Sequence, residues 1–537
     1  MINARSYNIF TIDTDHRIVI TTLYRKNDFE RAKHHQSSRR EGYKIITELK
    51  VKKQENRQKL SQAKTPEKVQ KLRKERNRLN NCIKKRIRYL ETTEMLKNAN
   101  EIMQAKDNAQ AALAIRKVLG RRNRKHKKIT NVELTKHFKE QFWTEEPQKV
   151  ANPGYLKLTT MSEVEKAKMK LKNGKAPGPD EITGEEIKAA NPVDITDKLN
   201  QLMIKKDSTL TEGFLVPIEK PGKDPGKPDS YRPVILLSAY RKLLSQIVLD
   251  RINPILESSL SSSQFAYRTN RSTGDIVLGH KYLLAGAIAK GLTMYCTGID
   301  MSKAFDNVIR SKLLEILAER GVPIHDITII KLLLTNTHLQ VKDGKDVGDL
   351  FETNKGVPQG DGLSPKLFTI YLDEALREID RKLDSDHQGY QKKGTATTLQ
   401  GHDYFKNARI ELPRHLEYAD DVDFFTTSEE DANKIEKVAA EVLQKYNLKV
   451  NPEKTEIFKY HKDTDLRKVR KLGTVLDELA EINRRKHLSQ LAMSKYKKIW
   501  KNRFINTKKK VKIYNVYAPY SYTTARHGPA IRALPIS

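Results

Sequence analysis

Two adjacent aspartates between two strand-like runs constrain the fold of this chain more than any other feature. The segment at 416–425 reads Leu-Glu-Tyr-Ala-Asp-Asp-Val-Asp-Phe-Phe, so Asp420 and Asp421 fall where a β-hairpin would turn. Adjacent carboxylates repel each other, and an apolar strand context makes a compensating cation necessary. An Asp-Asp pair taken alone is most often a plain turn, so the rest of the sequence has to decide between a turn and a cation-binding site.

A third aspartate ends another strand-like run. Tyr-Cys-Thr-Gly-Ile leads to Asp300, and Met-Ser-Lys-Ala-Phe-Asp follows it. If the two runs lie side by side, Asp300 comes beside Asp420 and Asp421, and the three carboxylates can hold two Mg²⁺ ions, or Mn²⁺ in their place. Such an ion pair activates a 3′-hydroxyl and stabilises a leaving pyrophosphate in an in-line phosphoryl transfer. The sequence therefore predicts a metal-dependent site.

The charge of the chain predicts a polyanionic partner. Its 537 residues include 101 Lys+Arg and 67 Asp+Glu, which give a net charge of +34. Nucleic acid is the first expectation, and a solvated charged surface is the alternative. We expect no membrane span and no export, because the longest apolar runs fall short of the ~20 residues that cross a bilayer. The two cysteines, Cys82 and Cys296, exclude a disulfide scaffold and a local zinc module.

The charge is unevenly distributed. Residues 1–150 hold 38 Lys+Arg against 17 Asp+Glu, and residues 461–537 hold 19 against 5. The middle segment, 151–460, holds 44 against 45. We therefore expect the metal-dependent chemistry in the neutral middle and salt-sensitive nucleic-acid binding by the two basic flanks.

Periodicity predicts the elements. Apolar residues at helical spacing indicate a long helical hairpin at 40–63 and 66–103, followed by a helix at 108–119. From about 130 the pattern is mixed α/β, with a capping box expected at Ser162 and Glu165. The predicted strands are 214–218, 294–300, 415–419 and 422–427. The predicted helices are 240–258, 273–290, 310–319, 364–382 and 429–446.

Eight segments in chain order resemble the reverse transcriptases of non-LTR (LINE-type) retrotransposons. Two of them are IDMSKAFDNV around Asp300 and YADD around Asp420. The others are GKAPGPDEIT at 174–183, KPGKDPGKPDSYRPVILLSAYRKLL at 220–244, SSSQFAYRTNRSTGDIV at 261–277, GVPQGDGLSPKLFTIYLDE at 356–374, NLKVNPEKTE at 447–456 and Lys471-Leu472-Gly473. The order and number of these matches make the resemblance specific.

The resemblance implies an α+β right-hand polymerase with fingers, palm and helical thumb, preceded by a basic α-helical N-terminal arm. The implied domains are an apurinic-type endonuclease remnant at 1–22, a basic helical arm or linker at 23–130, fingers and palm at 131–460, and a thumb with a C-terminal tail at 461–537. The segment 481–517 resembles the thumb, and we expect it to form an amphipathic helix. Its aromatic residues Tyr496, Trp500 and Phe504 should pack inside the protein.

The resemblance also assigns roles to carboxylates and to one aromatic residue. Asp300, Asp420 and Asp421 fall on the metal-binding aspartates of the family. Phe305, five residues after Asp300, falls on the steric gate, where a bulky ring blocks a nucleotide 2′-hydroxyl. RNA-dependent RNA polymerases usually carry a second aspartate at that fifth position, whereas here Asp306 is at the sixth, so the spacing favours DNA synthesis.

Five further residues match positions that bind the nucleotide. Arg232 and Lys220 fall on fingers residues that grip the triphosphate, which suits the planar guanidinium fork and the point charge of lysine. Gly356, Gln359 and Gly360 would let the backbone approach the nucleotide and template closely.

A lysine and three more acidic residues complete the assignment. Lys454 matches a lysine that protonates pyrophosphate as it leaves, with a plain surface lysine as the alternative. Asp423, Asp306 and Asp361 are not expected to be metal ligands. Asp361 stands where the family often has a small residue.

The ends of the chain resemble parts of longer elements. Asp15 and His16 look like the last motif of the apurinic-type endonuclease that precedes the polymerase in many LINE proteins. Because the other catalytic residues of that domain are missing, we expect a truncated element and no endonuclease activity from this chain. The C-terminal zinc knuckle of the family is also missing.

We therefore expect an RNA-directed DNA polymerase that extends a primer 3′-hydroxyl with dNTPs on an RNA template. Its partners would be an RNA template, a DNA primer and dNTPs, with no membrane. It would reside in the nucleus or cytoplasm as a ribonucleoprotein, and the sequence leaves its oligomeric state unknown. One alternative is a catalytically inactive truncated retroelement relic that only binds nucleic acid. A second is a group II intron-type maturase, although no maturase segment is evident.

Overall fold

The chain consists of two compact units. One comprises Met1–Arg121 with Met493–Val516, and the other comprises Arg122–Ala492 with Tyr517–Ser537. The computed structural model describes residues 4–6, 19–21, 39–105, 108–119, 129–145, 154–220, 222–291, 293–344, 346–385, 414–452 and 454–517. Asp15, His16, the basic run at 121–128 and the tail after 517 lie outside these ranges. Within them, no helix has the length and apolar character needed to cross a bilayer.

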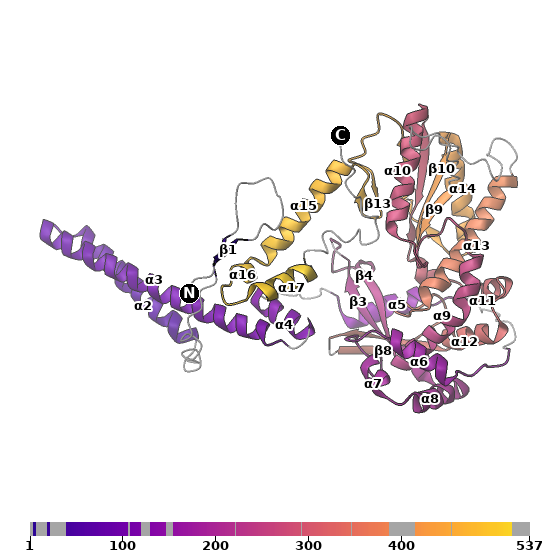
Figure 1. The fold of residues 1–537 in the computed structure, drawn as a ribbon, viewed down its shortest axis with the longest axis horizontal. Helices are drawn as coiled ribbons and strands as arrows, with labels where there is room; N and C mark the ends of the chain where they lie inside the picture. Colours follow the sequence, from indigo (N-terminus) through magenta and orange to yellow (C-terminus); the bar gives the residue numbers. More distant parts are fainter. Residues whose placement is uncertain are drawn as a thin grey trace. The chain divides into compact units, whose positions relative to one another are not determined.

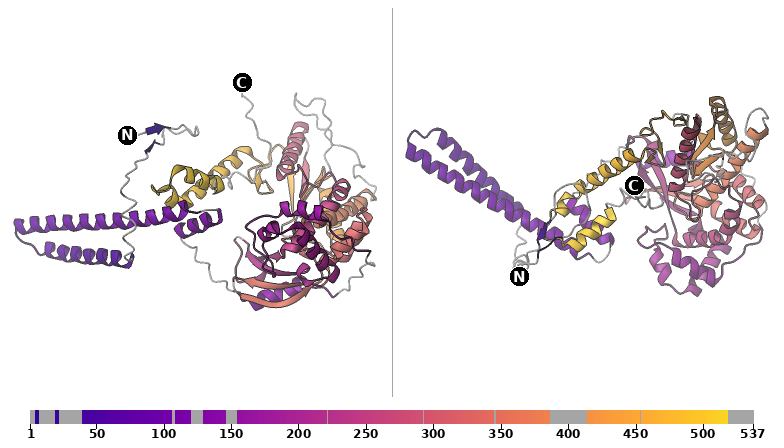
Figure 2. Two further views of the ribbon diagram at one scale, coloured as in Figure 1. Left: turned by 60° about the horizontal axis from the view of Figure 1, so that its bottom comes forward. Right: turned by 45° about the horizontal axis from the view of Figure 1, so that its top comes forward.

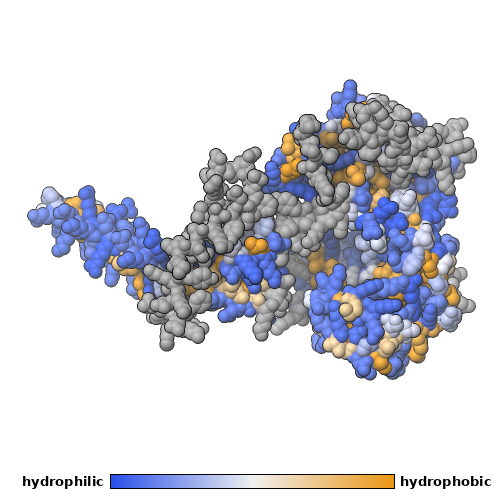
Figure 3. Space-filling model, viewed as in Figure 1, coloured by the Kyte–Doolittle hydropathy of each residue, from blue (hydrophilic) through white to orange (hydrophobic). Residues whose placement is uncertain are grey.

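The first unit is built on a long antiparallel helical hairpin. Its helices and strands are β1 (Ala4–Ser6), β2 (Val19–Thr21), α2 (Arg39–Ser61), α3 (Pro66–Met103), α4 (Asn108–Leu119), α16 (Lys497–Trp500) and α17 (Thr507–Tyr517). Proline in the first turn starts α3 at the predicted residue. Helices α2 and α3 run side by side (Figures 1 and 2), and their visible surface is almost entirely hydrophilic (Figure 3). The predicted hairpin and the predicted helix at 108–119 are confirmed.

The C-terminal part of this unit corrects one prediction. A single amphipathic helix over 481–517 is wrong, because α15 (Glu478–Lys495) ends before Tyr496 and the chain then bends through α16 into α17. The Asn502 side chain explains the break after α16, since its Oδ1 accepts a hydrogen bond from the Phe504 amide and its Nδ2 donates to the Met95 carbonyl. Tyr496 is buried, as expected for a packing aromatic.

The second unit is a mixed α+β structure. Its helices are α5 (Asn131–Gln141), α6 (Met161–Lys170), α7 (Gly184–Ala189), α8 (Pro192–Lys205), α9 (Ala239–Ser259), α10 (Thr273–Lys290), α11 (Arg310–Glu319), α12 (Ile324–Leu334), α13 (Ser364–Ser385) and α14 (Glu429–Lys445), with short turns η2 (Ser208–Leu210), η3 (Pro228–Ser230) and η4 (Ala304–Asn307). Its strands are β3 (Glu212–Glu219), β4 (Tyr231–Leu237), β5 (Met294–Ile299), β6 (Met301–Ser302), β7 (Thr337–Asp343), β8 (Asp346–Thr353), β9 (His415–Tyr418), β10 (Asp421–Thr426), β11 (Lys449–Val450), β12 (Glu456–Tyr460), β13 (Arg470–Lys471) and β14 (Thr474–Val475). The nine predicted strands and helices of this unit are all present, within about three residues at each end.

The capping box of α6 lies two residues earlier than predicted. The Thr160 hydroxyl accepts from the Glu163 amide, and the Glu163 carboxylate accepts from the Thr160 amide. Ser162 and Glu165 share the spacing of that pair, but they fall inside the helix.

One four-stranded sheet, in the order β12-β5-β10-β9, carries the acidic motifs. All its strand pairs are antiparallel. Side chains alternate between its faces, so Val422 and Phe424 of β10 join the core with α13 and α14, while Cys296 of β5 joins a smaller cluster with α10. Helices therefore cover both faces, as Figure 1 shows for α10 and α14.

A second four-stranded sheet, in the order β4-β3-β7-β8, stands nearby in the same unit. Strands β3 and β7 pair in parallel, and the other two pairs are antiparallel. Helix α5 packs Leu134 and Phe138 against this sheet, beside Leu215, Ile235 and Phe351. The burial of these apolar side chains holds a helix from residues 131–141 against strands far along the chain.

Candidate active site

Two neighbouring strands bring the three predicted aspartates together. Val422 of β10 pairs with Ile299 of β5, so one further step in the same register sets Asp421 opposite Asp300. Asp420 occupies the two-residue turn between β9 and β10 with Ala419, whose φ of +58° is the left-handed backbone conformation that this tight hairpin requires. The predicted juxtaposition of Asp300 with the Asp420–Asp421 pair is therefore present.

The carboxylates of the hairpin are electrostatically strained. Burial, together with the neighbouring charges of Asp420, Asp423 and Asp300, raises the pKa of Asp421 to about 6. Burial also raises the pKa of Asp420, with a smaller contribution from Asp300. Both shifts have the sign expected for buried like charges that require a cation.

Lys454 supplies one positive charge to this group. Its Nζ lies 3.0 Å from Asp300 Oδ2, on the segment between β11 and β12. The Lys454 side chain is 60% exposed, so solvent weakens the ion pair and leaves the ammonium free to move. The structure thus brings Lys454 to the aspartates, as the resemblance implied.

The three aspartates offer carboxylate oxygens, the ligand type that Mg²⁺ and Mn²⁺ take. Two ions in such sites stand ~3.5–4 Å apart, each with oxygen ligands at ~2.0–2.1 Å, so the ligand set is spread out. Among the described residues, the group whose ligand atoms all lie within 4.8 Å of one another is instead His280, Cys296 and Asp423. The Lys471 ammonium contacts Asp423 there and already supplies a cation.

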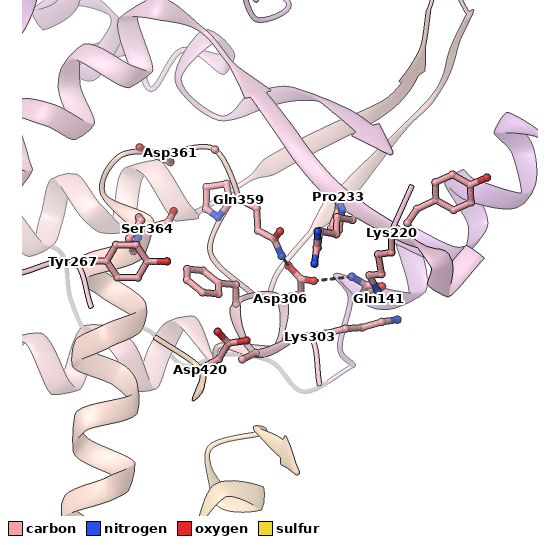
Figure 4. Close-up of a pocket in the computed structure, with 17 residues that line it drawn as sticks. Gln141, Lys220, Pro233, Tyr267, Lys303, Asp306, Gln359, Asp361, Ser364 and Asp420 are labelled. Atoms are coloured by element: carbon pink, nitrogen blue, oxygen red, sulfur yellow. Dashed lines mark hydrogen bonds between the residues drawn. The ribbon is translucent and has the colours of Figure 1, made fainter. Parts of the chain in front are cut away.

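A pocket of about 420 Å³ opens beside Asp420 (Figure 4). Six of the predicted site residues line it: Lys220, Arg232, Phe305, Gln359, Gly360 and Asp420. Figure 4 shows Asp420 and Lys220 on opposite sides of Asp306. The pocket lining does not include Gly356, Asp300, Asp421 or Lys454. Asp421 follows Asp420 in the chain, and the charges of Asp300 and Lys454 act on the Asp420 carboxylate.

One end of the pocket is cationic. Lys220 follows β3, Arg232 lies on β4, and Lys303 reaches in from a left-handed residue before η4. Burial lowers the pKa of Lys220, and the charges of Lys303 and Arg232 lower it further. Within the described part of the chain, the Arg232 guanidinium has no side-chain hydrogen bond or ion pair, while its backbone pairs with Ile218 of β3. This end is therefore suited to a polyanion such as a triphosphate.

The ring of Phe305 forms part of the pocket wall. It stacks on the ring of Phe368 with centroids 4.2 Å apart and an interplanar angle of 21°. Phe368 is fully buried in α13, so the stacking fixes the position of the Phe305 ring. A bulky ring held in this way can exclude an extra hydroxyl group from the pocket.

The glycines of the 356–361 loop contact protein backbone. A Cβ on Gly360 would lie 2.3 Å from the Ile235 carbonyl oxygen, and one on Gly356 would lie 2.7 Å from the Asp306 carbonyl oxygen. Gly356 also has a φ of +77°, and the Gln359 carbonyl accepts a hydrogen bond from the Ile235 amide. Both glycines therefore allow this loop to dock on β4 and η4, a reason that differs from the predicted approach to nucleotide.

Two of the three aspartates that were not expected to be metal ligands line the pocket and have specific partners there. Asp361 forms a buried ion pair with Arg241, whose Nε lies 3.1 Å from Asp361 Oδ2. Asp306 accepts hydrogen bonds from Gln359 and Gln141. Burial raises the pKa of Asp306 to about 7.

The pocket residues that the sequence analysis missed include Gln141, Tyr267 and Lys303. Lys303 lies inside the recognised IDMSKAFDNV segment and could have been found there. Tyr267 is half exposed and has a φ of +55°, which is uncommon for a bulky residue. Gln141 precedes every motif of the resemblance and carries no signal of its own.

A model of the reverse transcriptase (RNA-dependent DNA polymerase) family matches residues 218–514, more than half of the chain. The chain belongs to this family. The match runs from the end of β3 into α17 and includes all the lining residues of the pocket except Gln141.

Individual relatives agree with the resemblance to non-LTR elements. The probable RNA-directed DNA polymerase from transposon BS of Drosophila melanogaster is 31% identical over 158 residues, which are 29% of this chain and 17% of that protein. The RNA-directed DNA polymerase from mobile element jockey of the same species is 26% identical over 246 residues, 43% of this chain and 26% of that protein. The chain thus spans about a quarter or less of these relatives. A telomerase from Candida tropicalis aligns with a TM-score of only 0.35 and 17% identity, over 54% of this chain and 48% of that one.

Proposed function

We propose that this chain synthesises DNA on an RNA template by extending a primer 3′-hydroxyl with dNTPs. The observation that carries the proposal is the convergence of Asp300, Asp420 and Asp421 beside a pocket with a cationic end. In this proposal the β12-β5-β10-β9 sheet belongs to the palm and the β4-β3-β7-β8 sheet to the fingers, which together make up residues 131–460. The segment after 460 is the thumb, and residues 23–130 are the arm.

Different residues of the pocket contact different parts of the nucleotide in this proposal. Arg232, Lys220 and Lys303 bind the triphosphate at the cationic end. Phe305 stands where a ribose 2′-hydroxyl would have to fit, so it selects deoxyribose. Gln359 and Gly360 form the wall opposite the aspartates, and Lys454 gives a proton to the pyrophosphate as it leaves.

Asp300, Asp420 and Asp421 would hold two Mg²⁺ ions, or Mn²⁺ ions. When bound, these ions supply activation of the primer hydroxyl and charge stabilisation of the leaving group. The raised pKa values of Asp420 and Asp421 support this assignment, because two divalent charges would offset the mutual repulsion of the carboxylates.

The basic unit supports the proposed partners. The first unit presents a hydrophilic, Lys- and Arg-rich surface on α2 and α3. Such a surface suits sequence-independent contact with the phosphates of an RNA template or an RNA–DNA duplex. We also propose residence in the nucleus or cytoplasm as a ribonucleoprotein.

Primer extension tests the proposal directly. The purified chain, a DNA primer annealed to RNA, dNTPs and Mg²⁺ should give extended product, whereas the Asp420→Asn/Asp421→Asn double variant should give none. Asp463→Asn is a matched control, because Asp463 is an exposed aspartate of the same unit. Absence of product from the parent chain, or equal product from the double variant, would refute the proposal.

The alternative is a relic that binds nucleic acid without catalysis. Its specific support is the Lys- and Arg-rich surface of α2 and α3, which suits phosphate contact without any catalysis. Salt-sensitive RNA binding by the parent chain, without any Mg²⁺-dependent extension, would favour the relic.

A further inference from the structure

A buried carboxylate connects two glutamine side chains at the pocket. Asp306 is 1% exposed, and its two oxygens accept one hydrogen bond each. Gln359 Nε2 donates to Oδ1 at 2.7 Å, and Gln141 Nε2 donates to Oδ2 at 2.9 Å. Figure 4 shows both bonds meeting at Asp306. Three separate segments, α5, η4 and the 356–361 loop, are thus tied together by one carboxylate.

The position of Gln141 is fixed by the packing of α5. The Phe142 carbonyl, next in the chain, accepts hydrogen bonds from the amides of Asn354 and Lys355. Thr144 and Asn354 exchange two more, with N to Oδ1 at 2.9 Å and Nδ2 to O at 2.7 Å. The end of α5 is therefore pinned to the segment that leads into the 356–361 loop.

The polarity of the bridge determines how Gln359 is presented. An ionised carboxylate can only accept hydrogen bonds, so Gln359 has to turn its amide nitrogen toward Asp306 and its Oε1 away from it. The Oε1 of Gln141 is buried, with no partner among the described residues. An unsatisfied buried acceptor costs free energy. The orientation of the Gln141 amide accepts this cost at Oε1, and in return its Nε2 donates the hydrogen bond to Asp306.

We propose that Gln141 and Asp306 are positioning residues for the incoming nucleotide, which hold the Gln359 side chain in one orientation in the pocket wall. The inference rests on the proposed function and extends it to α5, which precedes the family match at 218–514. The same bridge also supports the steric gate, because Asp306 follows Phe305 in η4 and the Phe305 carbonyl accepts from the Val357 amide. Helix α5 is thereby a structural part of the nucleotide pocket.

The experiment compares steady-state extension by the full chain with its Gln141→Leu variant. The template is RNA with a single templating uridine, and dATP is varied with MgCl₂ present. Loss of a hydrogen bond to a charged group should raise the KM for dATP roughly fivefold or more, with kcat within about twofold. Asp306→Asn should have a similar effect, because its amide nitrogen would face one of the two glutamine donors. A KM within about twofold of the parent for a folded Gln141→Leu chain would overturn the inference.

Two controls separate positioning from a general loss of structure. Glu140→Leu alters the exposed neighbour of Gln141 on the same helix and should leave the KM unchanged. Gln141→Met keeps the volume and helix preference of glutamine without its donor, so it replaces Gln141→Leu if that variant melts at lower temperature. In an Asp306→Ala background, Gln141→Leu should add little to the KM, because the effects of coupled residues are not additive. Fully additive effects would show that Gln141 acts independently of Asp306, against the inference.

A binding measurement distinguishes this inference from the proposed function. Binding of a fluorescent dATP analogue to the full chain with MgCl₂ needs no catalysis. If the parent chain binds the nucleotide but extends no primer, weaker binding by Gln141→Leu upholds the inference while the proposed function fails. If the parent chain neither extends nor binds, both fail.

Discussion

Lys454 Nζ lies 3.0 Å from Asp300 Oδ2, so a lysine of the segment before β12 neutralises an aspartate that follows β5. The pair is far apart in sequence but adjacent in space, because Glu456 of β12 pairs with Gly298 of β5, and the turn before β12 places the Asn451 amide on the Asp300 carbonyl. This lysine therefore competes with divalent cations for Asp300, and it also stands within reach of a leaving group.

Replacing Lys454 should separate these two effects. In Lys454→Gln the competing cation is lost, so we expect half-maximal activity at a lower Mg²⁺ concentration, by up to roughly fivefold for so exposed an ion pair. The extension rate at saturating Mg²⁺ should fall roughly tenfold or more, because a general acid is lost. Single-turnover extension over a Mg²⁺ series measures both quantities, with the exposed Lys462→Gln as the matched control. A higher Mg²⁺ requirement with an unchanged rate would contradict the assignment.

Phe305→Val should relax sugar selection. The smaller side chain opens the pocket wall next to the proposed sugar site, while Phe368 behind it keeps the core filled on that side. The ratio of kcat/KM for dATP to that for ATP should fall by roughly tenfold or more, the size of effect that one lost steric clash in a pocket produces. Competition between dATP and ATP in primer extension measures this ratio. Phe458→Val, at a partly buried phenylalanine outside the pocket, is the control, and equal ratios in the two variants would remove Phe305 as the gate.

The elements of this chain were predictable, whereas several side-chain partnerships were not. Strands such as β5 and β10 and helices such as α13 were found because burial imposes local periods of 2 and 3.6 residues on their sequences. That Asp300 lies beside Asp421 was predicted from the two strand-like runs that carry these residues, together with the motifs of the family. The pairing of Arg241 with Asp361 joins residues 120 positions apart in the sequence, and the pairing of Gln141 with Asp306 joins residues 165 positions apart. No local pattern encodes such pairs, because each depends on how distant segments pack.

The contribution of Asp421 to the stability of the metal-free chain should be smaller above pH 6 than near pH 4. Folding raises the pKa of Asp421 from 3.8 to about 6, so the folded chain binds a proton more tightly than the unfolded chain does. The stability that Asp421 contributes is fully present below its pKa in the unfolded chain and is lost as the pH rises through its pKa in the folded chain. Asp421→Asn should therefore raise the unfolding free energy in EDTA at pH 7.5, although by less than the full pKa shift would give, because solvent at the exposed Asp421 side chain screens the charges. Urea unfolding at pH 7.5 measures this gain, and added Mg²⁺ should stabilise the parent more than the variant. If the Asp421→Asn chain were less stable than the parent in EDTA, repulsion among the carboxylates would not destabilise the folded hairpin.

Asp306 should make nucleotide binding depend on pH near neutrality. Its pKa is about 7 because burial outweighs the hydrogen bonds from Gln359 and Gln141 and the charges of Lys303 and Lys220. Above that pH the carboxylate accepts from both glutamines, whereas below it one oxygen carries a proton and one bond is lost. The KM for dATP should thus rise as the pH falls from 8 to 6. Initial rates across this range measure the profile, which should be flatter in Asp306→Asn because the variant lacks the titrating carboxyl group. An identical slope in the variant would place the titration elsewhere.

A buried ion pair beneath the hairpin should be needed for its stability. Asp423 lies two residues after Asp421, and its carboxylate contacts the Lys471 ammonium of β13 and His280 Nε2 of α10 at 3.0 Å. Although burial favours the neutral acid, His280 and Lys471 hold the pKa of Asp423 down to about 2. Gly298 leaves room for the pair, since a Cβ there would lie 2.9 Å from Asp423 Oδ1.

Removing either charge alone should be more harmful than removing both. Lys471→Met leaves the buried Asp423 carboxylate with only His280 as its partner and should cost up to about 3–5 kcal/mol of unfolding free energy. The double change Asp423→Leu/Lys471→Met should cost less than the sum of the two single changes. Urea unfolding of the four chains gives the coupling energy. Because Asp423 touches no pocket residue, the double variant should keep part of its extension activity while the metal-site variant Asp420→Asn/Asp421→Asn keeps none. Additive losses would mean that Asp423 and Lys471 stabilise the sheet independently of each other.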